Sequence, residues 1–168
     1  MTPLHWLTVE GHAAVVQWLI DDCSASVDST DAQTGQTSLH FAATKGRASV
    51  AEILLERNAD PVFCDRAGWL PLHAAARSGS TDVAAILLQK LTAKQVNLPG
   101  PGGETALHRA AYWGQVHVCA LLVQHGADPA LADDSGRCPY DVACDGGEHS
   151  TALPAIVGLL RPPAPSYS

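Results

Sequence analysis

One short motif recurs along the chain at intervals of 33 to 35 residues. The four clear copies are Thr2-Pro3-Leu4-His5, Thr37-Ser38-Leu39-His40, Leu70-Pro71-Leu72-His73 and Thr105-Ala106-Leu107-His108. A weaker fifth copy is Cys138-Pro139-Tyr140-Asp141. A regular period of this length is the signature of stacked structural units, each of which buries its apolar side against its neighbour. The sequence therefore predicts a repeat protein.

The residues around each motif predict two helices per unit. In the second unit, Thr37 can cap the free N–H groups of a short helix, and Gly46 can end that helix in a left-handed conformation. Ala42 and Ala43 are small, so two helices can approach closely there. A second helix follows, with an inner apolar stripe at spacings of three and four residues formed by Val50, Ile53 and Leu54.

The unit resembles the ankyrin repeat, whose signature is Thr-Pro-Leu-His-x-Ala followed by a glycine, an apolar helix and Gly-Ala-Asp. Asn58-Ala59-Asp60-Pro61 and Gly126-Ala127-Asp128-Pro129 supply the last part of that signature. The resemblance runs from Thr2 to about Leu160 and implies an all-α solenoid of about five helix-turn-helix repeats with β-hairpin fingers. We expect an ankyrin-repeat domain over residues 1–161, a Pro-rich tail over 162–168, and repeats at about 1–35, 36–68, 69–103, 104–136 and 137–161.

The third and fifth units depart from the pattern. In the third, Leu91-Thr92-Ala93 stands where the family has Gly-Ala-Asp, and we expect a hairpin enlarged by two residues. In the fifth, Asp141 replaces the histidine, Gly146-Gly147 loosens the first helix, and residues 148–153 hold an insertion. An irregular last unit is typical of the end of a repeat array.

The first unit carries an apolar set that an upstream repeat would normally cover, namely Trp6, Leu7, Val15, Val16, Trp18 and Leu19. An array needs polar-faced end units to stay soluble. Two interpretations follow: the chain is cut from a longer one, or its first unit is a modified cap. Trp18 holds a stripe position in a second helix, and we expect it in the core, whereas Trp6 fits either a buried or an exposed place.

Charge and cysteine usage limit the classes of function. The net charge of −7 and the lack of a Lys and Arg cluster argue against nucleic-acid partners. No apolar run is long enough to span a membrane and no secretion signal precedes the first repeat, so we expect no membrane insertion. The five cysteines are odd in number and include no Cys-x-x-Cys pair. Reduced thiols and a cytoplasmic or nuclear location are therefore expected, with Cys119 as a small core residue.

The histidines and acidic pairs raise the question of a metal or catalytic site. Four of the eight histidines recur at one position of the repeat, and in the ankyrin family this histidine bonds backbone groups of adjoining repeats. Chemistry would instead need different groups that converge on one place. The pairs Asp21-Asp22 and Asp133-Asp134 fit solvated turns. We expect no enzyme activity, no cofactor and no metal site.

The resemblance also implies where a partner binds. Ankyrin arrays generally hold other proteins at the hairpin tips and the outer end of each first helix, which together line a concave face. Aromatic and arginine side chains, which are enriched in binding hot spots, gather at these positions in the middle of the chain. We expect Trp69, Arg77, Tyr112 and Trp113 to be anchors, with further contacts from Arg66, Gln36, Lys45, Glu104 and Arg137. The alternative is that these aromatic residues only cover the small alanine core.

The sequence thus predicts a non-enzymatic protein-protein interaction module, a scaffold whose concave face grips a loop or extended peptide of a partner. We expect a monomer that binds a protein or peptide, and the net negative charge favours a partner with basic residues. Two alternatives stay open. One is a structural or self-assembly segment that associates through the uncapped first repeat, and the other is a regulatory arm of a larger multidomain protein such as an enzyme or channel.

Overall fold

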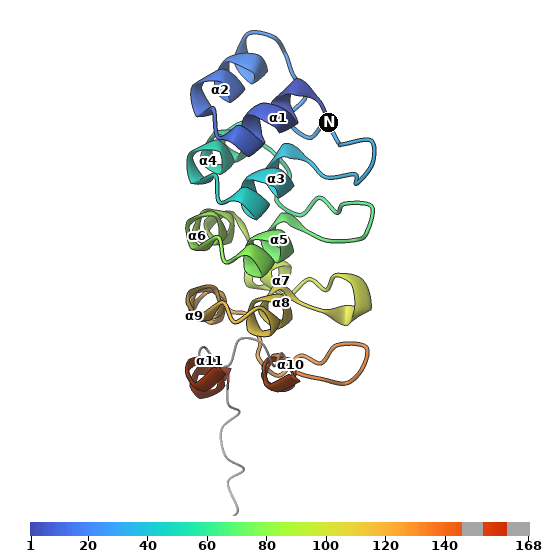
Figure 1. Ribbon diagram of the computed structural model, residues 1–168, viewed down its shortest axis with the longest axis vertical. Helices are drawn as coiled ribbons and strands as arrows, with labels where there is room; N and C mark the ends of the chain where they lie inside the picture. Colours follow the sequence, from blue (N-terminus) through green and yellow to red (C-terminus); the bar gives the residue numbers. More distant parts are fainter. Residues whose placement is uncertain (146–152, 161–168) are drawn as a thin grey trace, which may run out of the picture.

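The computed structural model describes residues 1–145 and 153–160, and within them the chain forms five successive helix pairs. The pairs stack along one axis, with the first helices in one column and the second helices in another (Figure 1). The first helices are α1 (Pro3–Glu10), α3 (Ser38–Lys45), α5 (Pro71–Ser78), α8 (Ala106–Tyr112) and α10 (Pro139–Asp145). The second helices are α2 (Ala13–Asp21), α4 (Ala48–Glu56), α6 (Thr81–Lys90), α9 (Val116–Gln124) and α11 (Leu153–Leu160). The predicted all-α solenoid is confirmed.

A buried histidine joins each of the first four units to the loop that leads into the next. In the second unit, the backbone N–H of Thr37 donates to Nδ1 of His40 at 3.2 Å, so the ring proton lies on Nε2. Nε2 then donates to the backbone oxygen of Trp69 at 3.0 Å. The equivalent Nε2 atoms of His5, His73 and His108 lie 2.8, 3.1 and 3.0 Å from the backbone oxygens of Ser29, Glu104 and Arg137. The structural role expected for this histidine is confirmed.

The fifth unit has only the first of these two hydrogen bonds. The carboxylate of Asp141 accepts a hydrogen bond from the backbone N–H of Cys138 at 2.9 Å, as Nδ1 of the histidine does in the other units. A carboxylate has no N–H group with which to reach a following loop. Asp141 therefore caps α10 locally without linking it onward.

Small residues allow the first helices to pack closely along the stack. Each of the three middle units buries a pair of adjacent alanines: Ala42 and Ala43, Ala75 and Ala76, Ala110 and Ala111. The second helices add larger buried side chains, namely Val50, Leu54, Val83, Leu87, Val118 and Leu122. Cys119 is fully buried among them, as expected, and burial raises the pKa of its thiol to about 12. The core is one continuous strip that each unit shares with its neighbours.

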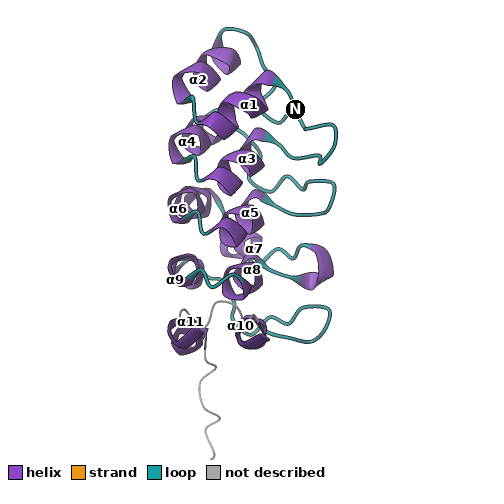
Figure 2. Cartoon of the chain, in the orientation of Figure 1, coloured by secondary structure: helices purple, strands orange, loops and turns teal. Residues whose placement is uncertain are grey.

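The fingers between helix pairs are closed loops, not strand ladders. In the described residues no strand forms, and the one β-bridge pairs Thr30 with Thr37 (Figure 2). One backbone hydrogen bond closes each finger: Asp31 to Gln36, Asp65 to Trp69, Gly100 to Glu104, and Asp133 to Arg137, all between 2.8 and 2.9 Å. Inside each finger a glycine N–H donates to the backbone oxygen of the first residue: Gly35 to Asp31, Gly68 to Asp65, Gly103 to Gly100, and Gly136 to Asp133. The expected hairpins are thus tight turns.

The third unit differs from the enlarged hairpin that its sequence predicts. The residues after α6 form an additional helical turn, α7 (Ala93–Val96). Thr92 caps it, accepting from the N–H of Gln95, while the Gln95 side chain accepts from the N–H of Thr92 at 3.0 Å. The finger tip that follows is a 3₁₀ turn, η1 (Pro101–Gly103). This Thr-x-x-Gln capping box was present in the sequence and is the signal that the hairpin interpretation overlooked.

The first unit shows where one prediction is wrong. Trp18 was expected in the core, yet 53% of its surface is exposed; Trp6 and Val15 are 61% and 42% exposed. In α4 and α6 the equivalent stripe residues, Ile53 and Ile86, pack against the core. Trp18 lies outside because α2 has no preceding helix pair beside it. The side of α2 that carries Trp18 is therefore part of the protein surface.

Some expectations fall outside the described residues. They are the loosening at Gly146-Gly147, most of the insertion at 148–153, and the Pro-rich tail at 162–168. Pro154 lies in the first turn of α11, where a proline needs no helical N–H partner. No helix in the described part of the chain has the length and apolar character needed to cross a membrane.

Candidate functional site

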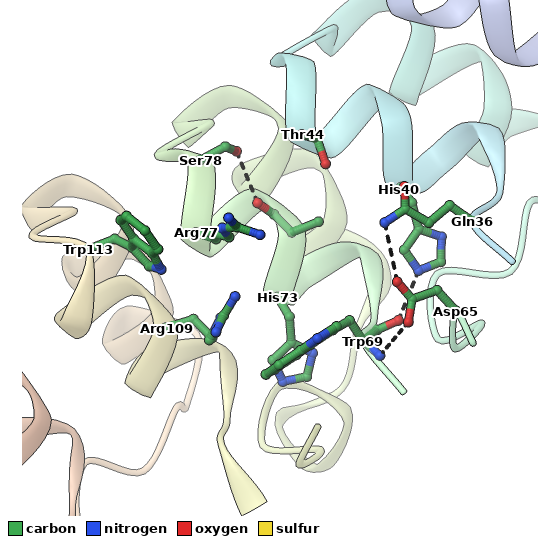
Figure 3. Close-up of a pocket in the computed structure, with 11 residues that line it drawn as sticks. Gln36, His40, Thr44, Asp65, Trp69, His73, Arg77, Ser78, Arg109 and Trp113 are labelled. Carbon is green, nitrogen blue, oxygen red and sulfur yellow. Dashed lines mark hydrogen bonds between the residues drawn. The ribbon is translucent and has the colours of Figure 1, made fainter. Parts of the chain in front are cut away.

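A groove of about 340 Å³ runs across the second, third and fourth units. Its walls come from three first helices, α3, α5 and α8, and from the fingers that precede α3 and α5 (Figure 3). The lining residues are Gln36, His40, Thr44, Asp65, Trp69, His73, Ala74, Arg77, Ser78, Arg109 and Trp113. Four of the nine residues predicted to bind a partner, Gln36, Trp69, Arg77 and Trp113, are brought together here.

Trp69 is held in place from several sides. Its backbone N–H donates to the Asp65 carboxylate at 2.9 Å, and its backbone oxygen accepts from His40. Its indole meets the His73 ring edge-on, with the ring centroids 5.4 Å apart. The Arg109 guanidinium lies over the indole, 4.2 Å from its centroid, which is a cation–π contact. Trp69 therefore presents a fixed aromatic surface to the groove.

A second stacked pair lies at the other end of the groove. The Arg77 guanidinium is 5.2 Å from the centroid of the Trp113 ring, so the third and fourth units meet through another cation–π contact. Tyr112 contacts Trp113 edge-on, at 5.5 Å between centroids. Tyr112 is 46% exposed and does not line the groove. It supports the Trp113 ring from outside.

The remaining predicted residues lie apart from the groove. Lys45 is exposed in the last turn of α3, and Arg66 is exposed on the second finger, where its Nη1 donates to the backbone oxygen of Gln33. Glu104 forms an ion pair with Arg109, with an N–O distance of 3.4 Å. Arg137 forms an ion pair with Asp133 on the last finger at 2.9 Å.

The expectation that the acidic residues of the fingers are solvated is wrong for Asp133. Asp133 was expected in a solvated turn, but it is 6% exposed, and its carboxylate accepts the backbone N–H groups of Ser135 and Arg137. Asp65 does the same for Ala67 and Trp69. Hydrogen bonds from these N–H groups, together with the Arg137 guanidinium, hold the pKa of Asp133 below its usual value. An Asp three residues before a glycine, present in both the second and the fourth finger, was the available signal.

Arg109 is the groove residue that sequence reasoning missed. It follows the motif histidine directly, at the position that Trp6, Phe41 and Ala74 occupy in the earlier units. Phe41 contacts His5 of the preceding unit, with the ring centroids 5.3 Å apart. The side chain at this position therefore contacts the preceding unit. In the fourth unit it places the Arg109 guanidinium over the Trp69 ring.

The groove histidines are neutral at pH 7. Burial lowers the pKa of His40, and it lowers the pKa of His73 to about 4. Both rings have their two nitrogen atoms engaged in hydrogen bonds to the backbone. Across residues 1–145 and 153–160, no group of three or more His, Cys, Asp and Glu side chains is arranged to hold a metal ion. The groove therefore offers aromatic faces and guanidinium groups rather than metal ligands.

Comparison with known proteins agrees with this fold. The family model for ankyrin repeats matches residues 1–63, 60–133 and 89–154, and the chain belongs to the ankyrin-repeat family of protein-interaction modules. It is 36% identical over 127 residues to protein phosphatase 1 regulatory subunit 12A of Mus musculus, covering 76% of this chain and 9% of that protein. It is 26% identical over 152 residues to a transient receptor potential cation channel subfamily A member 1 homolog of Caenorhabditis elegans, covering 90% and 12%.

A shorter match, 46% identical over 50 residues, is to the ARF GTPase-activating protein GIT2 of Mus musculus, covering 30% of this chain and 7% of that protein. The chain thus spans between 7% and 12% of the length of these three relatives. The similarity lies in the repeats, and the relatives are proteins of different kinds.

Proposed function

We propose that this chain binds a loop or extended segment of a partner protein in the groove between its second and fourth units. The carrying observation is the pair of indoles, Trp69 and Trp113, each stacked with an arginine of a neighbouring unit. Trp and Arg side chains that line a pocket are the usual anchors of protein interfaces. The role is non-enzymatic recognition, as one part of a scaffold or regulatory protein.

The rigidity of the groove supports this proposal. Trp69 is fixed by Asp65, His40, His73 and Arg109 before any ligand arrives. A side chain that is already ordered loses little conformational entropy on binding, so more of its contact energy appears as affinity. A surface whose only role was to cover the alanine core would not need this set of contacts.

A pulldown from cell extract tests the proposal. The wild type is compared with a Trp69→Ala/Trp113→Ala variant and with a Trp6→Ala/Trp18→Ala variant, which removes the same number of indoles outside the groove. Loss of a tryptophan anchor costs about 2 kcal/mol or more, roughly thirtyfold in affinity. We expect a partner that the groove variant loses and the control keeps. If both variants keep every partner while circular dichroism melts show them folded, the groove is not the binding site.

The exposed face of the first unit favours a second candidate function, association with another helix pair. Trp6 and Trp18 are 61% and 53% exposed, whereas the equivalent residues of the later units, such as Ala74, Ile53 and Ile86, are partly buried against the core. Large apolar patches on a protein surface usually mark an interface. Sedimentation velocity over a range of concentrations tests this. Association that disappears in the Trp6→Ala/Trp18→Ala variant supports it, and a monomer at all concentrations rules out self-association.

A further inference from the structure

We propose that the segment held in the groove carries an Asp or Glu side chain that pairs with Arg77 and Arg109, beside an apolar side chain that packs on the indoles. This inference rests on the proposed function and names the chemistry of its ligand. It differs from what the net charge of −7 suggests, because that charge favours a basic partner.

Arg77 provides the first cationic contact. It is exposed at the outer end of α5, and in the described residues its guanidinium forms no ion pair. Its contact is with the face of the Trp113 ring. A guanidinium that lies over a ring keeps its in-plane N–H groups available, and these match the two oxygens of a carboxylate.

Arg109 provides the second cationic contact. Its guanidinium lies on Trp69, and its Nε atom is buried without a hydrogen-bond partner. Its ion pair with Glu104 is long, 3.4 Å between Nη1 and Oε2. A charge that is partly withdrawn from water and weakly paired gains more from a nearby carboxylate than an exposed charge does.

The groove contains no free anion to compensate these arginines. Asp65 is its one acidic lining residue, and it is 8% exposed. One of its oxygens accepts the N–H groups of Ala67 and Trp69, and the other accepts from the side chain of Gln36 at 3.2 Å. The arginines lie on the α5 and α8 side of the groove, away from the Gln36–Asp65 pair (Figure 3).

Local charge decides what the groove holds because long-range charge is screened. At physiological ionic strength the Debye length is about 8 Å, so acidic residues on other faces act weakly at this site. A ligand carboxylate near both guanidinium groups makes direct, charge-assisted hydrogen bonds. The net charge therefore influences the approach of a partner, and the two arginines select the side chain that enters.

Selection from a random peptide library displayed on phage tests the inference. The immobilised probes are the whole wild-type chain, an Arg77→Glu variant and a Lys90→Glu variant. Lys90 is an exposed lysine in the last turn of α6, outside the groove and outside the residues expected to contact a partner, so its substitution makes the same charge change elsewhere. We expect wild type and Lys90→Glu to enrich peptides with Asp or Glu beside an apolar residue, and Arg77→Glu to lose them. Fluorescence anisotropy with one such peptide should give at least a tenfold weaker Kd for Arg77→Glu and less than a twofold change for Lys90→Glu.

The outcomes separate the two proposals. Peptides that need Trp69 and Trp113 but show no preference for Asp or Glu, or bind Arg77→Glu unchanged, overturn the acidic ligand and leave the groove as the binding site. Equal loss in Lys90→Glu also overturns it, because the effect is then general electrostatics. If no selected peptide depends on Trp69, the proposed function itself fails. An Arg77→Gln variant, with thermal melts for all proteins, checks that lost binding is not lost folding.

Discussion

The middle of this solenoid and its first unit contain the same kinds of residue in different circumstances. Trp69 and Trp113 in the middle each lie against an arginine of a neighbouring unit. Trp6 and Trp18 in the first unit are more than half exposed. The first helices of both regions share the motif histidine, which accepts the backbone N–H of the residue before the helix in all of them. In a stacked array, what a side chain does is decided by the neighbouring unit as much as by its own helix.

The largest expected effect compares the linking histidines of the two regions. His73→Ala removes a buried ring, the contact with Trp69 and the hydrogen bond to the Glu104 oxygen. We expect a loss of roughly 3 to 4 kcal/mol in the free energy of unfolding. His5→Ala should cost less, because its unit has a neighbour on one side only. Urea unfolding of both variants measures the difference, and equal losses would mean that position along the stack does not matter.

Acid should lower the stability of the middle units through the protonation of His73. The pKa of His73 is lowered from 6.5 to about 4 by burial, so the unfolded chain binds its proton first as pH falls. The stability that His73 contributes is present above pH 6.5 and is lost as pH falls from 6.5 to about 4. At about 1.4 kcal/mol per unit of pKa, this contribution is on the order of 3 kcal/mol.

A His73→Gln variant provides the check on that pH dependence. Its unfolding free energy, measured by urea titration at a series of pH values, should fall less steeply than that of the wild type between pH 6.5 and 4. His5 and His40 also have lowered pKa values, so part of the slope remains. An unchanged slope would show that His73 is not the main titrating group.

Replacing a tryptophan should cost more stability in the middle units than in the first unit. Trp69→Ala removes the contacts with His73 and Arg109, and we expect a loss of about 2 kcal/mol. Trp18→Ala should change stability by less than about 0.5 kcal/mol, because its side chain is mainly exposed. Thermal melts at several protein concentrations measure both. A large loss for Trp18→Ala that grows with concentration would instead indicate that the first face is covered by another copy.

The smallest expected effect is a gain in stability from a proline at position 38. Ser38 is the first residue of α3, it is fully buried, and its hydroxyl has no hydrogen-bond partner. The first and third units have proline at this position, in Pro3 and Pro71. Ser38→Pro removes the unpaired hydroxyl and restricts the unfolded chain, so we expect about 0.5 to 1 kcal/mol of added stability. Ser135→Pro, on an exposed finger, should not stabilise the protein, because its backbone N–H donates to Asp133. Urea unfolding checks both variants.

Features that lie within one unit could be predicted from the sequence. The motif period predicted the stack, and Thr37 and Gly46 predicted the two ends of α3. Asn58, which stands in the last part of the family signature, takes φ of 61°, as a left-handed residue after a helix does. Such signals come from residues a few positions apart, whose contacts are fixed as soon as the helix forms.

Features that join two units were predicted less well. The sequence placed Trp69, Arg77 and Trp113 at candidate binding positions, and the fold brings them to one groove. It missed Arg109 and Asp65, because each acts on Trp69 from another helix or through a turn. It assigned Tyr112 to the same set, although that residue does not line the groove.

The sequence by itself thus determined the repeat, the helix caps and the linking histidines, since these depend on spacing along the chain. Only the tertiary structure decided which aromatic residues are exposed and which arginines reach them. Trp18 shows the reason most directly: its stripe position predicts burial, but burial there needs a preceding helix pair, and α1 and α2 are the first pair of the described residues. Contacts across a stack depend on the order of the units, which a motif within one unit does not contain.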